Sequence, residues 1–303
     1  MNLVTFTPRT APTAAPRAGA LMPDGASVLN FAVAVDASAE VPLLAWFDLD
    51  DEWLQKVRQI HDALAKDAAR AETLPRGSVL PLSGVELGPP VPRPGKIICI
   101  GLNYRDHAAE SNMPVPASPV TFSKYVTSVI GPGRPIRLPK ASAQVDYEAE
   151  LAVVIGRRAK HVPVEQAFEH VLGYTNLNDV SARDLQFADG QWQRGKSCDT
   201  FAPMGPYIVT RDRVPDPHAL RIRCRVNGRT LQDSSTTQLI FGVDRVVSFL
   251  SETVTLEPGD VIATGTPPGV GFARKPPIFL QPGDVVEIEV EGLGVLSNPV
   301  TAE

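Results

Sequence analysis

The sequence has few cysteines, no long apolar run and little net charge, and each absence excludes a class of protein. Its 303 residues contain three cysteines, Cys99, Cys198 and Cys224, with no CxxC or other paired spacing. This argues against a disulfide framework and a zinc ribbon, and reduced cytosolic thiols explain it most simply. No segment is apolar for long enough to cross a bilayer, and the proline-interrupted N-terminus has no apolar run of signal-peptide length.

The formal charge of −5 disfavours nucleic acid or an anionic membrane as the main partner. We therefore expect a cytoplasmic protein that acts without a membrane or nucleic acid. Two catalytic signatures are also missing, the Gly-x-Ser-x-Gly elbow and the His-Glu-x-x-His helix. The Gly-rich segment 263–271 is no phosphate loop, because no Lys-Ser/Thr pair follows it and two prolines remove amide donors. A tight turn that follows a strand and presents Thr266 is the expected structure.

A proline-rich segment, residues 87–95, divides the chain in two and is stiff by composition. We expect residues 1–90 to form a small N-terminal structural domain, with a short strand at Ser27–Val35. A helix capped by Asp50 or Asp51 should follow, because apolar residues recur at helical spacing from Trp53 to Leu64. Residues 91–303 are then the catalytic domain.

Short strands dominate the pattern of this second part. Strands are expected at 96–100, 120–122, 146–155 and 220–226, and after the two Pro-Gly-Asp-Val turns at 258–261 and 282–285. Asn227-Gly228 predicts a hairpin turn, and helices are expected within 102–111, 163–171 and 240–250. Many strands with few helices indicate an α+β fold with a dominant β core.

The segment 146–155 is the most informative, because it places carboxylates where a buried strand should be apolar. In a strand, Asp146, Glu148 and Glu150 share one face. The uniformly apolar residues that follow are typical of a strand covered on both sides. Buried carboxylates need cations or a metal, so Glu148 and Glu150 could supply oxygen ligands to a hard divalent cation. The alternative is an exposed strand end with solvated acids.

Asp179 is a third candidate, predicted to lie where a strand ends and a short helix begins at Ser181. Capping of that helix is the alternative role of Asp179. Together with Glu148 and Glu150 it would complete a three-carboxylate set, the acidic triad, suited to Mg²⁺ or Mn²⁺.

Three further residues are candidates for proton transfer or for binding an anion. His107 and Glu110 lie three residues apart on a predicted helix and could form a base dyad, unless both are simply exposed on a surface helix. Lys196 follows a loop rich in Gln and Gly. Near a metal it would hold an anionic substrate or donate a proton; a surface lysine is the alternative.

Five motifs in one order resemble the fumarylacetoacetate hydrolase family over residues 93–300. They lie at 101–110, 146–151, 178–184, 195–197 and 264–271. The resemblance implies a mixed β-sandwich roll, a homodimer, and Mg²⁺ or Mn²⁺ bound by the acidic triad. It also implies a lid dyad of His107 and Glu110, and substrate contacts for a further set of residues: Lys196, Thr266, Arg183 and Gln186.

Within this family the chain looks most similar to bacterial acylpyruvases and 2,4-diketo-3-deoxy-sugar-acid hydrolases. The function expected from the resemblance is metal-dependent hydrolysis of a C–C bond in such a β-diketo acid, through a metal-stabilised enolate. The alternative on the same scaffold is an oxaloacetate decarboxylase or a 2-hydroxy-dienedioate isomerase, which needs the enolate but no attacking water. A non-catalytic metal-binding dimer module is the remaining alternative.

Overall fold

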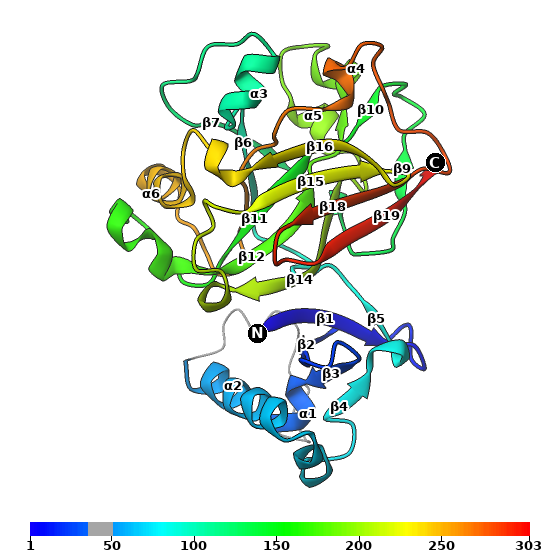
Figure 1. The fold of residues 1–303 in the computed structure, drawn as a ribbon, viewed down its shortest axis with the longest axis vertical. Helices are drawn as coiled ribbons and strands as arrows, with labels where there is room; N and C mark the ends of the chain where they lie inside the picture. The colour runs from blue at the N-terminus through cyan, green and yellow to red at the C-terminus, as the bar shows by residue number, and fades with distance from the viewer. Residues whose placement is uncertain (36–50) are drawn as a thin grey trace.

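Two β-sheets packed against each other form the body of the molecule (Figure 1). The computed structural model describes residues 1–35 and 51–303. The larger sheet has the order β4-β3-β2-β1-β14-β12-β11-β17-β6-β7, with β5 paired to β1 and β8 paired to β14. Its strands are β1 (Asn2–Pro8), β2 (Arg17–Leu21), β3 (Ser27–Asn30), β4 (Val79–Pro81), β5 (Val85–Leu87), β6 (Ile97–Gly101), β7 (Val120–Lys124), β8 (Val129–Ile130), β11 (Ala149–Ile155), β12 (Val171–Asn178), β14 (Ala202–Thr210) and β17 (Val261–Ala263).

The second sheet has five strands in the order β16-β15-β18-β19-β9. These are β9 (Ile136–Leu138), β15 (Arg221–Val226), β16 (Arg229–Ser235), β18 (Val285–Val290) and β19 (Val295–Ala302), and a separate short pair joins β10 (Val145–Asp146) to β13 (Ser181–Ala182). The helices are α1 (Phe31–Val35), α2 (Asp51–Lys66), α3 (Arg105–Glu110), α4 (Arg183–Gln186), α5 (Gln193–Lys196) and α6 (Val243–Thr253). The 3-10 helices are η2 (Ala68–Thr73), η3 (Leu82–Gly84), η4 (Val126–Ser128), η5 (Val164–His170), η6 (Arg211–Arg213), η7 (Thr236–Gln238) and η8 (Gly271–Ala273).

Strand β11 lies between two cores, which explains why its residues after Glu150 are all apolar. Leu151, Val153 and Ile155 enter the main core, together with the inward residues of β15 and β18. Ala152 and Val154 enter a second core on the opposite face, with residues of β1 and β14. Because successive side chains of a strand point to opposite faces, a strand buried on both sides must be apolar throughout. The α+β fold with a dominant β core is confirmed.

Several predicted elements are confirmed with shifted ends. Asn227 and Gly228 have φ values of 52° and 76° and join β15 to β16, as a two-residue hairpin turn requires. Both Pro-Gly-Asp-Val turns precede a strand, β17 and β18. The segment predicted as one strand, 146–155, is two, because the chain leaves the pairing at Tyr147 and Glu148 between β10 and β11.

Two predictions of local structure are wrong in part. Ser27–Val35 is a strand only as far as Asn30 and continues as α1. The helix predicted over 163–171 is the 3-10 helix η5, and Val171 already belongs to β12. Ser27–Val35 is apolar at nearly every position and so has no period that distinguishes a helix from a strand, and 163–171 is too short to show one clearly.

The N-terminal strands form one end of the larger sheet (Figure 1). Strand β1 pairs antiparallel with β14, Asn2 opposite Val209 and Leu3 opposite Ile208. Helix α2 buries Val57 and Leu64, and it begins at Asp51; the other predicted cap, Asp50, lies outside the described residues. The domain boundary at residue 90 stays a prediction.

Candidate active site

The antiparallel pairing of β11 with β12 brings the acidic triad together. Ala149 of β11 lies opposite Asn178 of β12. Glu148 and Glu150 are the neighbours of Ala149 in the chain, and Asp179 directly follows Asn178, so the pairing brings the three acids close together. One carboxylate oxygen from each of the three lies within 4.8 Å of the others, and all three side chains are buried. The exposed strand end considered as an alternative is therefore wrong. Asp179 also caps no helix: α4 begins at Arg183, with Ala182 as its N-cap.

Three buried cations surround the triad. Lys196 Nζ lies 2.7 Å from Glu148 Oε2 and 2.8 Å from Asp179 Oδ2. Lys124 pairs with the other oxygen of Asp179 and donates to the Val180 carbonyl at 3.1 Å. Arg183 lies 2.7 Å from Glu148 Oε1. Burial works against the charge of Lys196, but Asp179 and Glu148 outweigh it and raise its pKa. Lys196 is therefore a cation at neutral pH.

Glu150 differs from the other two acids, since it makes no ion pair with any described residue. Its side chain is 2% exposed and accepts a hydrogen bond of 2.8 Å from the Gly265 N–H. Burial, and then the charges of Asp179 and Glu148, raise its pKa well above the usual range. A divalent cation would offset the repulsion between Glu150 and the other two carboxylates. Carboxylate oxygens are the ligands that Mg²⁺ and Mn²⁺ prefer. The residues present thus fit such a metal.

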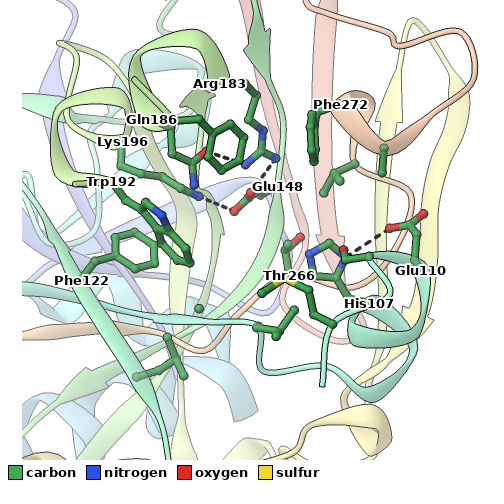
Figure 2. Close-up of a pocket in the computed structure, with 18 of the residues that line it drawn as sticks. His107, Glu110, Phe122, Glu148, Arg183, Gln186, Trp192, Lys196, Thr266 and Phe272 are labelled. Atoms are coloured by element: carbon green, nitrogen blue, oxygen red, sulfur yellow. Dashed lines mark hydrogen bonds and ion pairs between the residues drawn. The ribbon is translucent and has the colours of Figure 1, made fainter. Parts of the chain in front are cut away.

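The predicted dyad is formed beside the triad (Figure 2). His107 Nδ1 lies 3.2 Å from Glu110 Oε2, and the Gly269 N–H donates to Glu110 Oε1 at 2.9 Å. Burial works against ionisation of Glu110, but the hydrogen bonds from His107 and Gly269 outweigh it and lower its pKa. An ionised Glu110 holds a proton on Nδ1 of His107 and leaves Nε2 free to exchange one.

One pocket of about 420 Å³ joins these groups. Of the nine residues proposed from the sequence, eight line it: His107, Glu110, Glu148, Glu150, Arg183, Gln186, Lys196 and Thr266. Figure 2 shows His107 on one side of the cavity, and Arg183 and Lys196 on the other. The ninth, Asp179, lies behind them and pairs with Lys196.

Three of the proposed substrate-binding residues, Arg183, Gln186 and Thr266, also bind groups of the protein itself. Gln186 Oε1 accepts a hydrogen bond of 2.9 Å from Arg183, which itself pairs with Asp146 at 2.8 Å. Thr266 Oγ1 donates to the Ala149 carbonyl at 3.0 Å and accepts from Gln232 at 2.9 Å. Their contact with substrate stays a prediction.

Comparison with known proteins decides the family. Residues 96–301 match the model of the family described as fumarylacetoacetate (FAA) hydrolase, C-terminal. The chain belongs to the fumarylacetoacetate hydrolase family. It is an enzyme of this family, and the alternative of a non-catalytic module is disfavoured. The resemblance seen in the sequence is confirmed, whereas no finding distinguishes the bacterial branch expected there.

Three proteins similar to this chain match it over nearly its whole length. A mitochondrial oxaloacetate tautomerase of Xenopus laevis is 44% identical over 302 residues, which cover 99% of this chain and 90% of that protein. The structure of a 5-carboxymethyl-2-hydroxymuconate delta-isomerase from Mycobacterium smegmatis has a TM-score of 0.77 and 36% identity, with 100% of both chains covered. That of a fumarylacetoacetate hydrolase from Exiguobacterium antarcticum has a TM-score of 0.79 and 36% identity, again over 100% of both chains.

The homodimer and the cytoplasmic location stay predictions, and the Xenopus laevis relative is named as mitochondrial. Across residues 1–35 and 51–303, no helix has the length and apolar character that crossing a membrane requires.

Sequence reasoning missed several residues of this site. Lys124 holds Asp179 in place. Asp146 was noted as a carboxylate of the predicted strand, but not its pairing with Arg183. Four aromatic residues also line the pocket: Phe122, Phe187, Trp192 and Phe272. Lys124 lies two residues beyond the predicted strand 120–122, in a segment that mixes apolar and polar residues and gives it no distinct signal. Phe122 lies within that short strand, and the other three aromatic residues lie at helix ends or in a three-residue 3-10 helix, where no periodicity identifies them.

Gly271→Ala is expected to disrupt the loop around η8, which forms part of the pocket wall. A Cβ on Gly271 would lie 1.9 Å from the Ile278 carbonyl oxygen and 2.7 Å from Asp146 Oδ1. The Gly271 N–H also donates to that carboxylate at 2.7 Å. We expect a loss of stability of about 2–4 kcal/mol, measured by urea denaturation. Gly283→Ala serves as a control, because a Cβ there would meet no atom within 4 Å, although the φ of 96° at Gly283 is itself unfavourable for alanine. Equal losses in the two variants would contradict the steric argument.

Proposed function

We propose that this protein interconverts the keto and enol forms, or the double-bond isomers, of a 2-keto acid. The observation that carries the proposal is the shared reaction type of two relatives that match nearly the whole chain, an oxaloacetate tautomerase and a 5-carboxymethyl-2-hydroxymuconate delta-isomerase. Both names describe a proton moved between carbon and oxygen, or between two carbons, next to a carboxylate. This favours the alternative considered from the sequence over C–C hydrolysis.

The charges of the pocket support this chemistry. A divalent cation bound by the acidic triad would polarise the 2-keto oxygen and favour enolisation. Lys196 stays protonated between Glu148 and Asp179, so its role is to stabilise the negative charge of the enolate. Arg183, whose guanidinium Gln186 orients, is the residue proposed to bind a substrate carboxylate.

His107 is the group proposed to move the proton. With Nδ1 bound to Glu110, the free Nε2 can take the proton from the enol hydroxyl and return it to C3 of the same molecule. One O–H bond breaks and one C–H bond forms, and no water is consumed.

The test is the ketonisation of enol-oxaloacetate, followed by the loss of enol absorbance. We expect acceleration that needs Mg²⁺ or Mn²⁺ and disappears with EDTA, with oxaloacetate recovered intact by NMR. Release of CO₂ and pyruvate would instead identify a decarboxylase. No acceleration with either metal, for this enol or for that of phenylpyruvate, would contradict the proposal.

C–C hydrolysis of a β-diketo acid is the second candidate. It is favoured by the hydrogen bond between His107 and Glu110, which could activate water, and by the similarity to a fumarylacetoacetate hydrolase. Incubation with a simple acylpyruvate tests it, because only hydrolysis yields pyruvate and a free acid.

A further inference from the structure

Two aromatic rings in the wall of the pocket are left largely uncovered. Phe187 follows the last turn of α4 and is 52% exposed, and Phe272 lies in η8 and is 45% exposed. Their ring centroids lie 5.5 Å apart with an interplanar angle of 47°, and both rings line the pocket. We call these two residues the aromatic pair. Because exposed apolar area in a pocket is covered when a ligand binds, the pair indicates what that ligand carries.

The aromatic pair lies next to the charged end of the pocket. The guanidinium carbon of Arg183 is 5.6 Å from the centre of the Phe272 ring, and the same guanidinium lies 2.7 Å from Glu148 Oε1. Figure 2 shows Phe272 beside Arg183. One guanidinium group therefore separates the ring from the carboxylates of the acidic triad. A substrate anchored there by its carboxylate and 2-keto oxygen would bring its next substituent to the rings.

The opposite wall is already occupied by contacts within the protein. Phe122 and Trp192 pack edge to face with centroids 5.4 Å apart, and Lys196 Nζ lies 5.1 Å from the centre of the Phe122 ring. Both rings are less exposed than the aromatic pair. Of the two walls, the one formed by the aromatic pair therefore has the apolar surface that a ligand could cover.

From these contacts we propose that the aromatic pair binds a planar apolar group attached to C3 of the substrate or beyond it. The inference rests on the proposed function and narrows it to 2-keto acids with an aryl or conjugated extension, in preference to a four-carbon dicarboxylate. The pocket volume of about 420 Å³ agrees, since it falls in the range of roughly 300–1,000 Å³ that drug-sized ligands fill. Edge-to-face or offset packing against two rings favours a flat substituent.

Two substrates with the same reacting unit test the inference. The enols of phenylpyruvate and of oxaloacetate differ only in the group on C3, a phenyl ring or a carboxylate. We expect the wild-type protein with Mn²⁺ to have the higher kcat/KM for phenylpyruvate. Phe272→Ala and Phe187→Ala should each lower the ratio of the two kcat/KM values about tenfold or more, mainly through KM for phenylpyruvate. Phe272→Leu should fall between, because it keeps an apolar contact but loses the ring.

Phe279→Ala is the matched control, since Phe279 is partly buried and outside the pocket. The ratio of its kcat/KM values for the two substrates should equal that of the wild type. If the Phe272 variants lose kcat/KM for both substrates by the same factor, the inference is overturned and the proposed function still stands. The same holds if Trp192→Leu, and not Phe272→Ala, shifts the ratio. If the wild-type protein accelerates neither enol, the proposed function itself fails. Thermal melting of each variant separates a change in selectivity from a failure to fold.

Discussion

Glu150→Gln is expected to abolish metal binding while the protein stays folded. The substitution removes one of three anionic ligands and leaves a neutral amide of the same size. Even residues that only support a metal ligand cost about 10–100-fold in affinity when changed, so we expect Mn²⁺ affinity to fall at least about a hundredfold. The metal-free variant should melt at a higher temperature than metal-free wild type, because Glu150 is buried, repelled by Asp179 and Glu148, and unpaired among the described residues.

Titration calorimetry with Mn²⁺ and thermal melting with and without Mn²⁺ measure the two effects. Glu165→Gln, at an exposed position of η5 outside the pocket, is the matched control and should bind Mn²⁺ like the wild type. Mn²⁺ should raise the melting temperature of the wild type and of Glu165→Gln, but not that of Glu150→Gln. A Glu150→Gln variant that binds Mn²⁺ normally would contradict the assignment of the acidic triad.

The acidic triad could be predicted because its residues break a strong pattern. Carboxylates at alternate positions before the apolar residues of β11 conflict with burial, and a bound cation is one of the few ways to resolve that conflict. The structure bears out the physical reasoning even though the strand is interrupted at Glu148, whose N–H donates to the Asn178 side chain at 3.0 Å. The carboxylates remain gathered because the pairing of β11 with β12 fixes the position of Asp179.

The apolar wall of the pocket could not be predicted in the same way. Phe187 and Phe272 are far apart in the sequence and meet only because α4 and η8 pack on the same side of the cavity. An isolated aromatic residue in a loop has no period to reveal which side it faces. Lys124 was missed for a related reason: its partner Asp179 comes from a different strand, and only the folded sheet places the two together.

His107→Ala is expected to remove proton transfer and to leave metal binding intact. A positioned acid–base group contributes about 10²–10⁴-fold to rate, so kcat for enol-oxaloacetate should fall by that factor. His107 is not part of the acidic triad, and Mn²⁺ affinity should therefore stay close to that of the wild type. Near-full turnover in the variant would exclude His107 as the proton carrier.

Glu110→Gln should separate the two candidate reactions. The glutamine carbonyl can still accept the hydrogen bond from His107 Nδ1, but it no longer supplies a charge to stabilise the imidazolium. An enol polarised by a metal is a much stronger acid than water, so ketonisation needs a weaker base at His107 than hydrolysis does. Ketonisation by Glu110→Gln should therefore slow only about tenfold. Hydrolysis of an acylpyruvate requires a proton from water and should slow at least about a hundredfold.

The two rates of Glu110→Gln are compared at saturating Mn²⁺, with Asp106→Asn as a neighbouring control. Asp106 lies on the same helix, α3, and accepts hydrogen bonds from Ser234 and from the backbone N–H of His107, but none from the His107 imidazole. A loss of ketonisation as large as that in His107→Ala would show that the Glu110 charge is required for this step as well. Such a result would contradict the expected separation of the two reactions by Glu110→Gln.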